Sequence, residues 1–109
     1  MNMTQHTLNL KALEDTRSRD KLFVRFNRAA SLLASQERGC EVSCYDVDNT
    51  TKRTAYKVEL WLDVNRRKVG RCDCLARVVC KHILRAVLLH IARKRAAQNV
   101  SIAETLRRN

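Results

Sequence analysis

The sequence predicts an α+β fold in which an N-terminal helix precedes an antiparallel β-meander, a cysteine-rich loop and a long C-terminal helix. Three observations predict this order: helical spacing of apolar residues over residues 20–37, alternation over residues 54–62, and a second helical stripe over residues 81–97. The length of 109 residues suits one domain, and an apolar content of 45% favours a folded chain over a disordered one.

The first predicted helix runs from about Asp20 to Glu37. Its apolar side chains recur three or four positions apart, at Leu22, Phe26, Ala29, Ala30 and Leu33. Gly39 is placed to end this helix in the left-handed conformation that a C-terminal cap requires. Residues 8–20 are more weakly helical. We therefore expect residues 1–39 to form an N-terminal helical region that packs on the rest of the chain.

The middle of the chain favours strands. Residues 41–47 favour a first strand, and residues 48–51, Asp-Asn-Thr-Thr, form a turn signal. Residues 54–62 alternate most clearly and predict a strand with Val58 and Leu60 on one face and Trp61 on the other. Residues 67–71 would then return as a short strand that ends at the first cysteine of a cluster.

The strongest predicted helix covers residues 81–97, with an apolar stripe at Leu84, Val87, Leu88 and Ile91. Asn99 is expected to interrupt it. Ser101 and Glu104 have the spacing of a capping box, so residues 99–109 are expected to form a short basic C-terminal helix or tail.

Between the last strand and this helix, four potential metal ligands fall within eleven positions: Cys72, Cys74, Cys80 and His82. The pattern is C-x-C, five residues, then C-x-H. Zinc binds thiolates and imidazole tetrahedrally, and a structural zinc site fills all four positions with protein ligands. The sequence therefore predicts one structural Zn²⁺ ion. The histidine and the tight spacing favour zinc over an iron–sulfur cluster, and a redox-active C-x-C pair is a further alternative.

The residues Tyr56-Lys57-Val58, Cys72-Asp73-Cys74 and Cys80-Lys81-His82-Ile83-Leu84 together resemble the SWIM zinc finger, whose pattern is C-x-C-xn-C-x-H. The resemblance covers about residues 40–92. It implies a ββα-type zinc module over residues 40–98 that binds DNA or proteins. Such modules occur in chromatin-remodelling ATPases, transposases and recombination-associated proteins.

The net charge of +11 is concentrated in the C-terminal part of the chain. Residues 66–109 carry twelve Lys/Arg and two Asp/Glu, against ten and nine in residues 1–65. A one-sided basic surface attracts polyanions, so we expect backbone-dominated binding of nucleic acid, with DNA favoured over RNA. The candidate contacts are Arg66, Arg67, Lys68, Arg71, Arg77, Lys81, Arg85, Arg93, Lys94 and Arg95.

A protein-interaction adaptor is the alternative function. The protein would then regulate a recombination, transcription, mobile-element or viral complex, and the N-terminal helix, through Leu22, Phe26 and Leu33, would dock a partner or a second copy. A solvated charged helix face is the plainer interpretation of the basic residues. Trp61 could stack a base or mark a partner surface, but packing against the N-terminal helix explains it equally well.

The sequence does not favour an enzyme. It contains no phosphate-binding glycine loop and no nucleophile motif, and a zinc with four protein ligands has no position for substrate.

No secretory leader and no membrane-spanning stretch is evident, so we expect an intracellular protein, cytoplasmic or, in a eukaryote, nuclear, without a membrane partner. Cys40 and Cys44 could contribute to a second metal site, although small apolar packing residues are the expected role.

Overall fold

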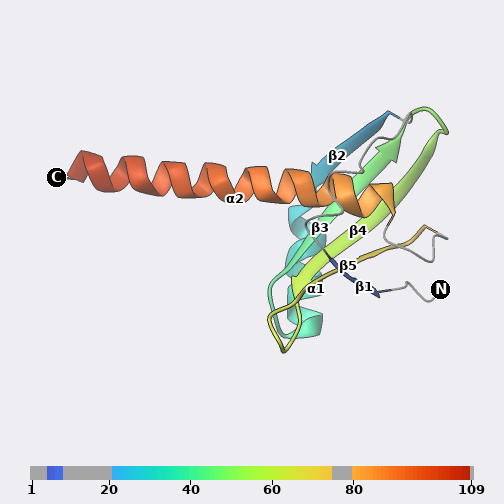
Figure 1. Ribbon diagram of the computed structural model, residues 1–109, viewed down its shortest axis with the longest axis horizontal. Helices are drawn as coiled ribbons and strands as arrows, with labels where there is room; N and C mark the ends of the chain where they lie inside the picture. Colours follow the sequence, from blue (N-terminus) through green and yellow to red (C-terminus); the bar gives the residue numbers. More distant parts are fainter. Residues whose placement is uncertain (1–4, 9–20, 75–79, 109) are drawn as a thin grey trace.

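The computed structural model describes residues 5–8, 21–74 and 80–108, which form a five-stranded antiparallel sheet and two helices (Figure 1). The strand order in the sheet is β1-β5-β4-β3-β2. The elements are β1 (Gln5–Thr7), β2 (Leu22–Phe26), α1 (Arg28–Arg38), β3 (Val42–Asn49), β4 (Thr54–Leu62), β5 (Lys68–Cys72) and α2 (Lys81–Arg108).

The predicted layout, with a helix at the N-terminus of the fold, is wrong. The part of the predicted helix that contains Leu22 and Phe26 is the edge strand β2, which pairs with β3 from Leu22↔Asn49 to Phe26↔Tyr45. The first described element is also a strand, β1. Five residues such as Leu-Phe-Val-Arg-Phe fit both a helical and an alternating period, and pairing with a distant strand selects the alternating one. The weak helical prediction for residues 9–20 lies outside the described residues.

This correction also removes the predicted docking face. Leu22 and Phe26 lie on β2 and pack against the core beneath α2, whereas Leu33 is on α1 and 58% exposed. The three side chains therefore do not share one helical face, and no partner surface follows from their spacing.

Helix α1 begins directly after β2 and is capped at both ends. The Asn27 side chain accepts a hydrogen bond from the Ala30 amide at 3.0 Å, and Gly39 ends the helix at φ 73°, as the sequence predicts. Two helix hydroxyls, those of Ser31 and Ser35, accept hydrogen bonds at 2.8 Å from the amides of Cys44 and Val42 on β3. The helix thereby provides hydrogen-bond acceptors for the amides of β3 that lie beyond the end of its pairing with β2.

Strands β3, β4 and β5 form the predicted meander and separate two apolar clusters. On one face, Tyr45, Val58 and Ile83 belong to a cluster of buried residues that joins the sheet to α2. On the other, Val42, Cys44, Trp61 and Val69 pack against alanines of α1. The alternation predicted for residues 54–62 is confirmed, since Val58 and Leu60 face α2 and Trp61 faces α1.

Helix α2 is one continuous helix from Lys81 to Arg108, so the predicted interruption at Asn99 is wrong. Asparagine lowers helix propensity only slightly, and no glycine or proline stands nearby to break the helix. At 1.5 Å per residue the helix is about 42 Å long. Only its N-terminal half packs on the sheet, and every residue from 92 to 100 is exposed. We call residues 92–108 the arm, which projects away from the sheet (Figure 1).

None of the helices in the described part of the chain is both long enough and apolar enough to cross a membrane.

Candidate metal centre

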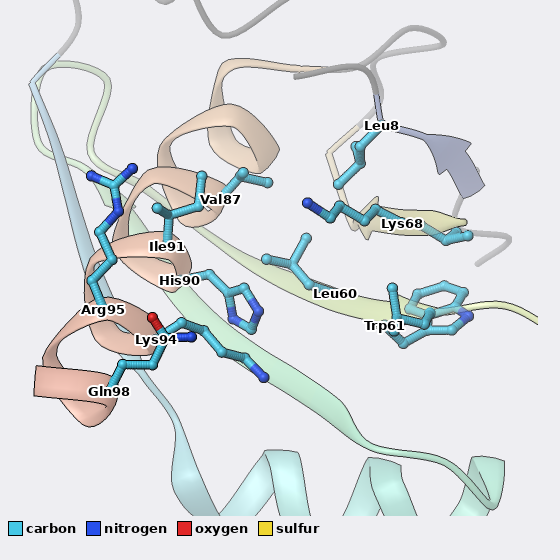
Figure 2. Close-up of a pocket in the computed structure, with 12 residues that line it drawn as sticks. Leu8, Leu60, Trp61, Lys68, Val87, His90, Ile91, Lys94, Arg95 and Gln98 are labelled. Atoms are coloured by element: carbon cyan, nitrogen blue, oxygen red, sulfur yellow. The ribbon is translucent and has the colours of Figure 1, made fainter. Parts of the chain in front are cut away.

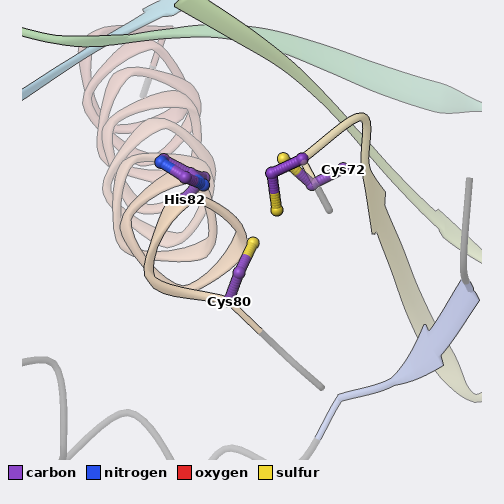
Figure 3. Close-up of side chains that lie close together, drawn as sticks. Cys72, Cys80 and His82 are labelled. Atoms are coloured by element: carbon purple, nitrogen blue, oxygen red, sulfur yellow. The ribbon is translucent and has the colours of Figure 1, made fainter. Parts of the chain in front are cut away.

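The four predicted ligands come together at the junction between β5 and α2. Cys72 is the last residue of β5, Cys74 follows two positions later, Cys80 directly precedes α2, and His82 is the second residue of that helix. Their ligand atoms all lie within 4.8 Å of one another. Figure 3 shows Cys72 and Cys80 facing each other from the strand side and the helix side, with His82 beside them. This Cys₃His group could hold one metal ion.

The C-x-C half of the group is fixed to strand β4 through Asp73. The Asp73 carboxylate accepts a hydrogen bond from the Lys57 amide at 2.8 Å, and the Asp73 amide donates to the Lys57 carbonyl at 3.2 Å. Cys72 itself pairs with Val58 in the β4–β5 ladder. These contacts fix the backbone at Cys72 and Asp73 against β4, and they thereby restrict the positions of the two cysteine side chains of the C-x-C motif.

The C-x-H half is fixed by the start of α2 and by the core. Cys80 and His82 are 8% and 5% exposed, and Ile83, which follows them, is 1% exposed. The imidazole of His82 lies against the ring of Tyr56, with the ring centroids 4.2 Å apart. Burial on both sides therefore restricts the orientation of the histidine.

The chemistry of the group fits a metal. Neither ring nitrogen of His82 has a hydrogen-bond partner outside the cluster among the described residues, although both are buried. Buried polar nitrogens without partners are costly, and a metal ion would bind one of them. Three thiols and one imidazole are also the donor set of a site for a borderline or soft cation.

The thiols also influence each other's protonation. The hydrogen bond between Cys72 and Cys80 lowers the pKa of Cys80 and raises the pKa of Cys72, whose burial raises it further. The amide of Ile83 in the first turn of α2 also favours the Cys80 thiolate. Negative charge therefore concentrates at Cys80, where a bound cation would neutralise it.

Comparison with known proteins assigns the chain to no family. No family model, no curated protein and no solved structure matches this chain. The assignment of the site consequently depends on its own geometry and on the residue pattern.

The described residues among the ten predicted to contact nucleic acid lie on several elements of the fold. Arg66, Arg67 and Lys68 are exposed at the β4–β5 turn, and Lys94 and Arg95 are exposed on the arm. Lys81 and Arg85 are partly buried on the first turns of α2. Arg77 lies outside the described residues.

Arg71 and Arg93, both predicted contact residues, have contacts that join separate elements of the fold. Arg71 forms a salt bridge of 3.3 Å with Glu59 on the α1 face of the sheet. The guanidinium of Arg93 lies 3.4 Å from the centroid of the Phe26 ring and donates a 3.1 Å hydrogen bond to the hydroxyl of Tyr45. Both arginines therefore help to join elements of this chain, which the sequence alone does not reveal.

Sequence reasoning named Asp73 and Tyr56 as parts of the motif but did not reveal how they support the metal group. Asp73 lies inside the C-x-C motif, but its hydrogen bonds to Lys57 depend on strand pairing. Tyr56 reaches His82 only because β4 passes beneath the start of α2. The alternation of residues 54–62, which places Tyr56 on the α2 face with Val58, was the available signal for its position.

Cys40 and Cys44 lie in different environments. Cys40 is exposed, whereas Cys44 is 7% exposed and packs in the cluster beneath α1. Among residues 5–8, 21–74 and 80–108, the group from Cys72 to His82 is the one cluster of at least three Cys, His, Asp or Glu side chains that could hold a metal ion.

Proposed function

We propose that Cys72, Cys74, Cys80 and His82 bind one structural zinc ion, and that the protein binds nucleic acid, DNA in preference to RNA. The observation that carries the proposal is the position of the ligand group at the origin of α2. A metal there would fasten the base of the helix whose arm carries exposed cations into solvent.

The donor set supports zinc and a structural role. Three sulfurs and one imidazole nitrogen supply the four ligands of a closed tetrahedral site, which leaves no position for a substrate. A zinc ion in this site supplies a cross-link between β5 and α2 across residues 75–79. The resemblance of the motif to the SWIM zinc finger supports the same assignment.

The distribution of charge supports a polyanionic partner. The described arm residues 92–100 include Arg93, Lys94 and Arg95 and no acidic residue, and the β4–β5 turn adds three further exposed cations. Cations on a projecting helix can approach phosphates without rearrangement of the fold. Such contacts contribute affinity and salt dependence rather than sequence specificity.

Metal analysis of the purified protein tests the first half of the proposal. We expect one zinc per chain, with Cys74→Ser losing both the metal and the cooperative unfolding transition, because structural sites couple metal binding to folding. Cys40→Ser is the matched control, since Cys40 is exposed and outside the group. A wild-type protein that folds equally well after removal of all metal would contradict the structural role.

Binding to duplex DNA and to RNA, measured against salt concentration, tests the second half. For duplex DNA each neutralised phosphate contributes about 0.9 to the slope of log affinity against log salt, so the double variant Lys94→Gln/Arg95→Gln should lower the slope by about 1.8. Arg25→Gln/Arg28→Gln removes two exposed cations elsewhere and should leave the slope unchanged. No binding at low salt, or equal slopes for both double variants, would refute this interface.

A further inference from the structure

A groove of about 380 Å³ opens where α2 leaves the sheet. Its apolar lining comes from both sides, with Leu60 and Leu62 on β4 and Val87 and Ile91 on α2. Figure 2 shows Leu60 facing Val87, Ile91 and His90 across this space. Leu62 is 52% exposed, so apolar surface remains available to a ligand.

The rim of the groove is cationic. Lys68 from β5 and Lys94 and Arg95 from the arm line it, and no Asp or Glu is among the described residues that do so. His90 does not add to this charge near neutral pH, because burial and the neighbouring Lys94 lower its pKa. The Nδ1 atom of His90 is also engaged, at 2.8 Å from the hydroxyl of Tyr45. The groove thus combines an uncharged floor with a positive edge.

These features favour a peptide over a nucleic acid. A single-stranded nucleic acid would need an aromatic face on which to stack a base. Two aromatic residues line the groove, Trp61 and His90. The indole of Trp61 is 8% exposed and belongs to the cluster beneath α1, where the guanidinium of Arg38 lies 3.8 Å from its ring centroid. The ring of His90 is held by its contact with the hydroxyl of Tyr45. Apart from Trp61 and His90, the apolar lining is aliphatic.

We infer that this groove docks an acidic amphipathic segment of a partner protein. Aliphatic side chains of that segment would cover Leu60, Leu62 and Ile91, and its carboxylates would face Lys68, Lys94 and Arg95. This is the arrangement in which a helix places its apolar stripe in a groove and its charges at the rim. The inference does not depend on nucleic-acid binding.

The test uses the full-length, metal-loaded protein and three labelled synthetic peptides of about 16 residues, roughly four helical turns. The first peptide carries leucines at helical spacing among glutamates. The second has the same composition in scrambled order, and the third has lysines in place of the glutamates. Fluorescence anisotropy should show binding of the first peptide alone, weakening as salt increases.

Two leucine variants locate the binding surface. Leu62→Ser should weaken binding of the first peptide about fivefold, as expected when a half-exposed leucine is covered by a ligand. Leu32→Ser is the matched control, because Leu32 is 60% exposed on α1 and outside the groove, and it should leave the affinity unchanged.

The inference is overturned if the amphipathic peptide does not bind, if the scrambled peptide binds equally, or if both leucine variants behave alike. A single-stranded oligonucleotide that displaces the peptide and loses affinity in Leu62→Ser would also overturn it, because the groove would then accept a nucleic acid.

Discussion

Replacement of Gly70 by valine tests how closely α2 approaches the sheet. A Cβ atom at Gly70 would lie 3.0 Å from Cδ2 of Leu60, 3.1 Å from Cγ2 of Ile83 and 3.4 Å from Cδ1 of Leu8. The Ile83 contact is the less adjustable, because this β-branched side chain is 1% exposed on the first turns of α2. Overpacking of this kind destabilises by about 1–3 kcal/mol.

Two effects oppose the steric term for Gly70→Val. Loss of glycine reduces the entropy of the unfolded chain, which stabilises by about 0.4–1 kcal/mol, and valine favours strands. We therefore expect Gly70→Val to lower the free energy of unfolding by about 1–2 kcal/mol. Because Ile83 follows His82, displacement of α2 would also separate His82 from Cys72, and zinc affinity should fall in the same variant.

Urea unfolding of the metal-loaded protein, followed by the fluorescence of the single tryptophan, Trp61, would measure this loss. The double variant Gly70→Val/Leu60→Ala should be less destabilised than the sum of its single variants, because the shortened side chain makes room for the new methyl groups. If Gly70→Val is as stable as the wild type, the close approach of α2 is refuted. If the two changes are simply additive, the contact between position 70 and Leu60 on β4 is refuted.

Three further predictions concern the metal, the pH and the first helix. Asp73→Ala should lower zinc affinity about tenfold or more, measured by competition with a chelator, because the link to Lys57 is lost. Asp63→Ala, which removes similar hydrogen bonds in the β4–β5 turn, should not. Burial lowers the pKa of His90 below the value of 6.5 expected in the unfolded chain. The stabilisation that neutral His90 provides is therefore complete above pH 6.5 and is lost as the pH falls through the lowered pKa. The stability difference between wild type and His90→Gln should therefore shrink from about pH 7.5 to about pH 5.5 in urea unfolding, and a constant difference would contradict this. Gly39, at φ 73° with no atom within 4 Å of an added Cβ, should tolerate asparagine better than alanine, which should cost about 1 kcal/mol by thermal unfolding. Equal stability of the two variants would argue against a conformational role.

The candidate metal group was predictable because its members are close in sequence. Cys72 to His82 span eleven positions, and short spacings limit where their side chains can lie whatever the rest of the fold. The same locality explains the correct prediction of the Gly39 cap and of the alternating strand over residues 54–62. The loop between the two halves of the group, residues 75–79, lies outside the described residues.

The positions of the charged side chains were less predictable. Arg71 and Arg93 have the same formal charge as their exposed neighbours, but Glu59 and Phe26 engage them from strands distant in sequence. Composition assigns all these cations to one basic surface, whereas the fold uses Arg71 and Arg93 in contacts that join its elements.

The sequence by itself determined the ligand group, the excess of positive charge in the C-terminal part and the presence of a long final helix. These properties depend on residue type and on short-range spacing. Tertiary structure alone decided that residues 22–26 form an edge strand, that Gly70 lies beneath α2, and that a groove opens where α2 leaves the sheet. The physical reason is that strand pairing and helix packing join residues far apart in the chain, and their free energy outweighs the small local preferences on which a prediction from sequence depends.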